Sequence, residues 1–345
     1  MSAAWIEALN AGQVIPAMPL ALREDGTWSE THQRALLRYY CAAGAGGIAV
    51  GVHSTQFAIR DAAYGLYQPL LKFCTECLDD DSTVDDKFIR IAGICGATRQ
   101  AVEEAELASQ LGYHAGLVSL SALSTQTESE LLTHLQTVAS AIPIVGFYLQ
   151  PAVGGRVLSY DFWCRVCEID RLVAVKIAPF NRYQTLDVVR AVIDAGRSDV
   201  ALYTGNDDSI VLDLLTQWQF RGVSRFIAGG LLGQWGVWTR AAVRMLRDVQ
   251  AVRTQPTIPR EWLTRNAQLT DANAAIFDAA NAFRGCIPGI HEVLRRDGLI
   301  PSTRCLNPDE VLSPGQSEEI SRVIAAYPEL TDTDFVAENL SAWMS

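Results

Sequence analysis

The segment LVAVKIA (172–178) has the composition of a strand that is buried on both faces of a sheet. Its apolar residues run continuously, whereas a strand with one solvated face alternates apolar and polar residues. Lys176 is the one charged residue in the run. A lysine placed there either reaches water from the strand end or loses its hydration, and loss of hydration favours the neutral amine. Because a neutral amine is a nucleophile, Lys176 is a candidate Schiff-base lysine.

Seven further runs of this kind occur in the first two-thirds of the chain: VIPAMPL (14–20), GGIAVGV (46–52), FIRIAGI (88–94), AGLVSL (115–120), IPIVGFYL (142–149), VALYTGN (200–206) and SRFIAGG (224–230). Segments with helical spacing separate them, and one opens on a capping box at Thr127 and Glu130. Strands that alternate with helices predict a parallel sheet, and eight strands close a (β/α)8 TIM barrel. An open doubly wound sheet is the alternative, but no glycine-rich phosphate turn follows the first run.

The chain is longer than a barrel requires. A TIM barrel takes about 250 residues, and this chain has 345. The pattern of strands stops before a proline-bearing break, TQPTIPREW (254–262). We therefore predict a barrel over residues 10–250 and a C-terminal helical extension over residues 251–345.

Composition and charge narrow the class of function. A net charge of −11 argues against a nucleic-acid partner, which requires a basic face. No apolar run approaches the ~20 residues of a membrane span, and the N-terminus lacks the pattern of a signal peptide. We expect a cytoplasmic protein with reduced thiols. Cys74/Cys77 and Cys164/Cys167 have the spacing of a zinc site, but both pairs fall in helical segments, where packing is the simpler interpretation.

Candidate site residues follow from the barrel, since the active sites of TIM barrels lie at the carboxyl ends of the strands. Tyr148 ends the strand before that of Lys176, and its phenol could act as a general acid and base; a core tyrosine is the alternative. The candidate substrate contacts at the other strand ends are His53, Ser54, Thr55, Gly205, Asn206 and Gly229.

Some residues near these strand ends have more than one interpretation. His53 suits acid–base chemistry, a substrate contact or a purely structural hydrogen bond. Asp207 and Asp208 are read chiefly as the start of a helix, and a metal site is the less favoured alternative. Trp235 and Trp238 indicate either core packing or a contact between subunits.

Two of these strand ends resemble the dihydrodipicolinate synthase and N-acetylneuraminate lyase superfamily of class I aldolases. That family has a Tyr-x-x-Pro motif at the end of strand five and a Schiff-base lysine on strand six. The corresponding residues here are Tyr148-Leu149-Gln150-Pro151 and Val175-Lys176-Ile177. The opening Pro16-Ala17-Met18-Pro19-Leu20 and the segment Ala43-Gly44-Ala45-Gly46-Gly47-Ile48 are also similar.

The resemblance implies a TIM-barrel lyase that forms a Schiff base between Lys176 and a 2-keto acid. It further implies that Tyr148 moves the proton, that no metal or cofactor takes part, and that the chain is a homodimer or homotetramer.

The chain also departs from the family pattern. The family usually carries Gly-Thr-Thr-Gly-Glu after strand two, and its hydroxyls and amides hold the carboxylate of the keto acid. This chain has Gly51-Val52-His53-Ser54-Thr55-Gln56, in which Ser54 and Thr55 are the available hydroxyls. The family's second tyrosine, after strand four, is absent. Two alternatives therefore stay open: a barrel enzyme in which Lys176 acts only through its charge, and a non-catalytic ligand-binding barrel.

Overall fold

The barrel is formed by eight parallel strands in a computed structural model that describes residues 3–345. Neighbouring strands follow the order β1-β10-β7-β6-β5-β4-β3-β2. A parallel bridge between Ala17 and Ala49, with the Met18 N–H donating to the Ala49 carbonyl at 2.9 Å, brings the two ends of this order together. The strands are β1 (Val14–Pro16), β2 (Gly47–Val50), β3 (Ile89–Ile94), β4 (Ala115–Val118), β5 (Ile144–Leu149), β6 (Leu172–Ala178), β7 (Ala201–Thr204) and β10 (Gly229–Leu232).

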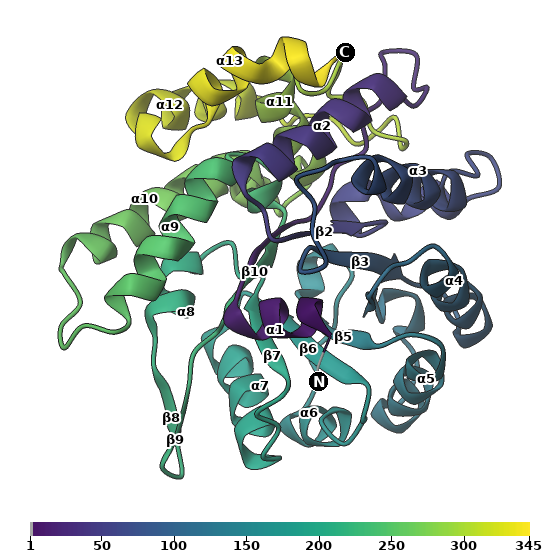
Figure 1. Ribbon diagram of the computed structural model, residues 1–345, viewed down its shortest axis with the longest axis vertical. Helices are drawn as coiled ribbons and strands as arrows, with labels where there is room; N and C mark the ends of the chain where they lie inside the picture. The colour runs from purple at the N-terminus through teal and green to yellow at the C-terminus, as the bar shows by residue number, and fades with distance from the viewer. Residues whose placement is uncertain (1–2) are drawn as a thin grey trace.

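Helices surround the barrel and connect its strands, as Figure 1 shows. The ring consists of α2 (Glu30–Ala43), α3 (Tyr67–Asp79), α4 (Thr98–Gln110), α5 (Glu128–Ala141), α6 (Tyr160–Val166), α7 (Arg182–Asp194), α8 (Ile210–Leu215) and α9 (Thr239–Val252). The capping box predicted for α5 is present: Thr127 accepts from the Glu130 N–H, and Glu130 accepts from Thr127. The predicted TIM barrel is confirmed. Within residues 3–345, none of the helices combines the length and apolar character needed to cross a bilayer.

The last barrel strand lies later in the chain than the sequence predicts. Residues 224–230 were expected to form it, but a two-stranded hairpin of β8 (Trp218–Phe220) and β9 (Val223–Arg225) occupies the start of that segment. The turn residues Arg221 and Gly222 both have positive φ, 49° and 80°, as a tight two-residue hairpin turn requires. The hairpin projects from the barrel in Figure 1, and the eighth barrel strand begins only at Gly229.

One end of the barrel is closed by helix α1 (Ala4–Ala11). In Figure 1 this helix crosses the barrel opening. Its Leu9 side chain belongs to the core inside the barrel, and the Tyr203 hydroxyl donates to the Leu9 carbonyl at 2.8 Å. The open end is therefore the opposite one, where the strands have their carboxyl ends.

The C-terminal helices pack on the barrel of the same chain. They are α10 (Glu261–Ile276), α11 (Cys286–Arg296), α12 (Gln316–Ala326) and α13 (Thr333–Trp343). The Asp332 carboxylate, just before α13, accepts from the Tyr39 hydroxyl of α2 at 2.7 Å and from the Arg240 N–H of α9 at 2.6 Å. Trp235 and Trp238 are both buried, which confirms core packing and leaves no subunit contact for them to make.

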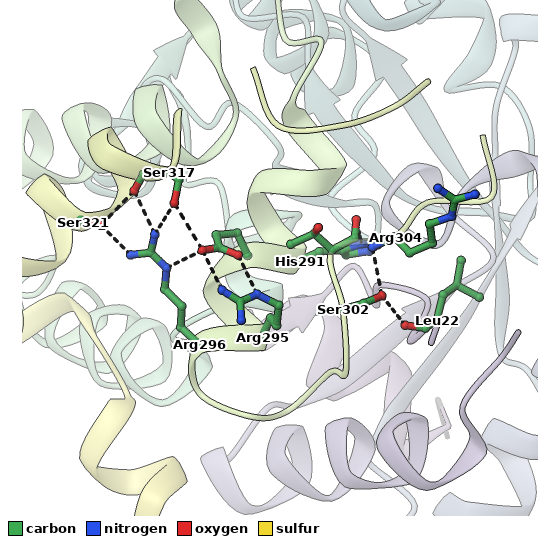
Figure 2. Close-up of polar contacts among 10 residues, drawn as sticks. Leu22, His291, Arg295, Arg296, Ser302, Arg304, Ser317 and Ser321 are labelled. Carbon is green, nitrogen blue, oxygen red and sulfur yellow. Dashed lines mark hydrogen bonds and ion pairs between the residues drawn. The ribbon is translucent and has the colours of Figure 1, made fainter. Parts of the chain in front are cut away.

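Polar contacts fix α11 and the segment after it, as Figure 2 shows. Glu292 pairs with Arg295 and Arg296, each at 2.8 Å, and Arg296 also donates to the Ser317 hydroxyl at 2.9 Å. The Ser302 hydroxyl donates to the Leu22 carbonyl, near the start of the barrel, at 2.7 Å. The helix is thus tied to α12, and the segment after it is tied to the loop that follows β1.

Replacing Asp332 by alanine should destabilise the protein by about 3 kcal/mol, because buried donors on α2 and α9 lose a charged acceptor. Chemical denaturation of the wild type and the variant measures this. Asp334→Ala, at an exposed position in α13, is the matched control and should change the free energy of unfolding by less than about 0.5 kcal/mol. Equal effects of the two substitutions would contradict the assigned role of Asp332.

Candidate active site

A cavity at the carboxyl ends of the strands contains Lys176. The space between its lining side chains is about 590 Å³, including the part open to solvent. Most of the wall is apolar, and its larger members are Phe147, Leu149, Phe180, Phe277, Phe283 and Ile290. The polar lining side chains include Lys176, His53, Ser54, Gln150 and Asp207, and no arginine is among the lining residues of the described chain.

Lys176 points into the cavity because side chains alternate along β6. Its neighbours Val175 and Ile177 pack outward against the helices, so Lys176 faces the barrel interior. The residue is only 8% exposed, and burial lowers the pKa of its amine to about 8, although the Asp207 carboxylate opposes this shift. The Nζ atom lies 4.4 Å from the centre of the Phe147 ring. The amine is therefore far easier to deprotonate than an ordinary lysine.

Gly205 lines the cavity as predicted, and its role is steric. A Cβ atom at this position would lie 2.8 Å from the Cε of Lys176 and 2.7 Å from the Cβ of Ala178. Any side chain at this position would displace the lysine. The missing side chain thus provides the space in which Lys176 reaches the cavity.

Asp207 also lines the cavity, from the loop after β7, where it directly follows the predicted contacts Gly205 and Asn206. Burial raises the pKa of its carboxyl to about 7, and the Lys176 ammonium opposes the shift. Its Oδ1 atom is buried without a hydrogen-bond partner among the described residues. The interpretation as a helix start is wrong for Asp207, because α8 begins at Ile210 and Ser209 precedes it as the N-cap residue. The loop is held instead by the Asn273 side chain, which donates to the Asp207 carbonyl at 2.7 Å.

The three candidates after β2 take different positions. His53 lines the cavity, and burial together with the Lys176 charge lowers the pKa of its imidazole to about 4, so the ring is neutral. Ser54 also lines the cavity, but its hydroxyl donates to the Ala17 carbonyl at 2.8 Å. Thr55 is fully buried and donates to the Met18 carbonyl at 2.6 Å while it accepts from the Gly51 N–H. Thr55 thus stabilises the loop and does not face the cavity.

The structure does not bring Tyr148 to Lys176. Tyr148 points out of the barrel toward the helices, where its ring packs 5.3 Å from that of Trp163. Its hydroxyl donates to the Leu158 carbonyl at 3.2 Å and accepts from the Leu158 N–H at 3.1 Å. Phe147 occupies the inward position beside Lys176. The assignment of Tyr148 as the proton-transfer residue is therefore corrected, and the core-tyrosine alternative describes its position.

Two other predicted contacts also lie away from the cavity. Asn206 is buried, and both polar atoms of its side chain form hydrogen bonds. Its Oδ1 accepts from the Phe180 N–H at 3.0 Å, and its Nδ2 donates to the Asp213 carboxylate at 2.8 Å. Gly229 starts β10, and a Cβ atom there would meet the Gln13 carbonyl oxygen at 2.3 Å, at the end closed by α1. Because the strand begins later than predicted, Gly233 takes the cavity position that was assigned to Gly229.

The roof of the cavity comes from the C-terminal helices, which sequence reasoning did not include in the site. Phe277 follows α10, Phe283 lies in the next loop, and Cys286 and Ile290 belong to α11. The Phe283 ring packs edge-on against Phe180 of the barrel, with centroids 5.7 Å apart. Part of the site is therefore formed by residues far from the barrel strands in the sequence.

Sequence comparisons relate this chain to known proteins of one family. The model of the dihydrodipicolinate synthetase family matches residues 10–225. A 4-hydroxy-tetrahydrodipicolinate synthase of Nostoc sp. is 32% identical over 137 residues, which are 39% of this chain and 45% of that protein. The corresponding enzyme of Synechococcus sp. is 26% identical over 211 residues, 60% of this chain and 64% of that protein. The chain thus spans less than two thirds of the length of these relatives.

Solved structures share the fold at low identity. Dihydrodipicolinate synthase from Aquifex aeolicus superposes with a TM-score of 0.73 at 18% identity, over 93% of this chain and 99% of that one. N-acetylneuraminate lyase from Fusobacterium nucleatum gives a TM-score of 0.71 at 16% identity, over 92% and 99%. At such identities the likeness is one of architecture.

The rate at which a small amine-reactive reagent labels Lys176 should rise through pH 8 and level off above it, because burial lowers the pKa of the amine to about 8. Competitive labelling followed by mass spectrometry measures the profile. The other two lysines of the chain, Lys72 and Lys87, are exposed and serve as internal controls. A midpoint for Lys176 equal to theirs would contradict its desolvation.

Proposed function

The chain belongs to the dihydrodipicolinate synthetase family, and on that premise we propose that it is a lyase that forms a Schiff base between Lys176 and a 2-keto acid. The observation that carries the proposal is the buried, easily deprotonated amine of Lys176 at the open end of the barrel. A neutral amine attacks a ketone, whereas an ammonium group cannot.

The chemistry follows from that attack. The Nζ lone pair adds to the ketone carbon, and loss of water leaves an iminium ion. The iminium withdraws electrons from the neighbouring carbon, which favours cleavage or formation of the adjoining carbon–carbon bond, or loss of water from it. His53 and Gln150 line the cavity and carry N–H groups that suit the carboxylate of the keto acid.

The cavity also favours one class of keto acid. Once Lys176 is in the imine, no other cationic side chain of the described lining is left to pair with a second anionic group. Phe147, Leu149, Phe180 and Phe283 surround the space beside it. An alkyl or aryl substituent buries apolar surface there, while a second carboxylate would be desolvated without a partner. We therefore propose a monoanionic 2-keto acid with an apolar substituent.

Incubation with a panel of 2-keto acids and then borohydride should add the mass of a reduced adduct to Lys176. The panel includes pyruvate, alkyl and aryl 2-keto acids and a dicarboxylic one, and we expect the apolar members to label fastest. Lys176→Arg keeps the charge without a neutral amine and should abolish the adduct. Lys72→Arg, at an exposed helix position, is the matched control and should label like the wild type.

The outcome separates the alternatives. Turnover that survives in Lys176→Arg without any adduct would identify a barrel enzyme that uses the lysine only for its charge. Saturable binding of a keto acid with neither adduct nor turnover would identify a ligand-binding barrel. Either result would overturn the Schiff-base proposal and reduce the family likeness to one of fold.

We also propose that the chain assembles as a homodimer or homotetramer, as implied by the family resemblance. Sedimentation at micromolar concentration should give a species of two or four chains. A single species with the mass of one chain would refute this assembly. Because Trp235 and Trp238 are buried, the interface has to use other surfaces.

A further inference from the structure

We propose that Asp207 is the general acid and base of this site, in the role that the sequence pattern assigns to Tyr148. The inference rests on the proposed Schiff-base function. It concerns a residue on the loop after β7, which lies on the opposite side of β6 from β5 and its tyrosine.

Elimination among the lining residues leads to Asp207. The Tyr148 hydroxyl lies outside the barrel and is bonded to Leu158. The Ser54 proton is donated to a backbone carbonyl, and burial raises the pKa of the Cys286 thiol, which keeps it protonated. The His53 ring is neutral, and its low pKa makes it a poor base. Asp207 is left as the carboxyl in the described lining of the cavity that contains the Lys176 amine.

The Asp207 carboxyl has an unused hydrogen-bonding position that a ligand could take. Its Oδ1 atom is buried yet has no hydrogen-bond partner among residues 3–345, which is costly unless a substrate group or proton engages it. The Gln234 backbone N–H bonds to the same carboxyl group, and the Asn273 side chain donates to the Asp207 backbone carbonyl at 2.7 Å, so both parts of the residue are tied to the protein. Lys176 and Asp207 line the same cavity and form no direct ion pair, although their charges interact, so a carbonyl group bound there could meet both.

The proton balance of imine formation fits one carboxyl group. Neutral Lys176 adds to the ketone carbon, and protonated Asp207 gives its proton to the carbonyl oxygen. The resulting carboxylate takes a proton from the nitrogen, which leaves a neutral carbinolamine and restores the acid. Asp207 then protonates the hydroxyl group, which departs as water. The products are the iminium ion and the Asp207 carboxylate, so one positive and one negative charge face each other.

Burial makes these transfers accessible. The pKa of Lys176 falls to about 8 and that of Asp207 rises to about 7, so the two values converge. A proton then passes between nitrogen, substrate oxygen and carboxyl without a large mismatch in affinity. With ordinary values for an amine and a carboxyl, the proton would stay on the amine and prevent the attack.

Asp207→Asn tests the inference with two readouts on the full chain. The first is the rate of borohydride trapping with the keto acid that labels the wild type fastest, which should fall by ~100-fold or more. The second readout is the rate at which an amine-reactive reagent labels Lys176 at pH 7. Loss of the carboxylate removes the charge that raises the pKa of Lys176, so labelling should become faster. Asp208→Asn, next in the chain and outside the cavity lining, should leave both within about twofold.

The results separate three cases. Slower trapping with faster amine labelling supports Asp207 as the acid and base. Unchanged trapping in Asp207→Asn overturns the inference, and so does a parallel loss of both readouts, which would show that Asp207 only positions the lysine. If the wild type itself forms no adduct, the Schiff-base proposal fails, and that result is distinct from any effect of the substitution. A thermal melt of each variant confirms that it is folded.

Discussion

The removal of one amine from water is the constraint on which the rest of the site depends. Lys176 is buried at the open end of the barrel, and its charged form is disfavoured there. Three features maintain that state: the inward register of β6, the missing side chain at Gly205, and the apolar roof that includes Phe283. Asp207 limits the cost, because a second buried charge of opposite sign keeps the ammonium form accessible. Burial favours the neutral amine and Asp207 favours the ammonium form, so both forms of Lys176 are accessible in this cavity.

Much of the fold could be predicted from the sequence, because buried parallel strands and their helices have distinct periodicities. Seven of the eight predicted runs, from residues 14–20 to residues 200–206, contain the whole of a barrel strand, whereas the eighth reaches its strand only at Gly229 and Gly230. The eighth failed because an apolar run carries no information about the hairpin turn beside it, at Arg221 and Gly222. Because the eighth strand begins at Gly229 and does not end there, Gly229 lies at the closed end of the barrel.

The site was harder to predict, since a single register decides which side chains meet. Ile144 pairs with Leu172, but Val145 pairs with Ala174, so β6 contains one extra residue relative to β5. Without that irregularity Tyr148 would lie opposite Lys176; with it, Phe147 does. The spacing of 28 residues between the tyrosine and the lysine fits either arrangement. The sequence motif therefore predicted the position of Lys176 in the cavity correctly, but not that of Tyr148.

The C-terminal part of the cavity lining bears on the proposed role of Asp207, since Tyr148 lies outside the cavity. Phe277, Phe283 and residues of α11 cover part of the cavity that contains Lys176, and α11 is fixed by the pairing of Glu292 with Arg295 and Arg296. Exclusion of water raises the proton affinity of the Asp207 carboxylate, which gives it the basicity that acid–base catalysis near neutral pH requires. An exposed aspartate would be ionised and would hold no proton to give. In the proposed mechanism the C-terminal segment thus contributes through the burial of the cavity that Asp207 lines, and a chain that ended with the barrel would keep Asp207 but lose part of that burial.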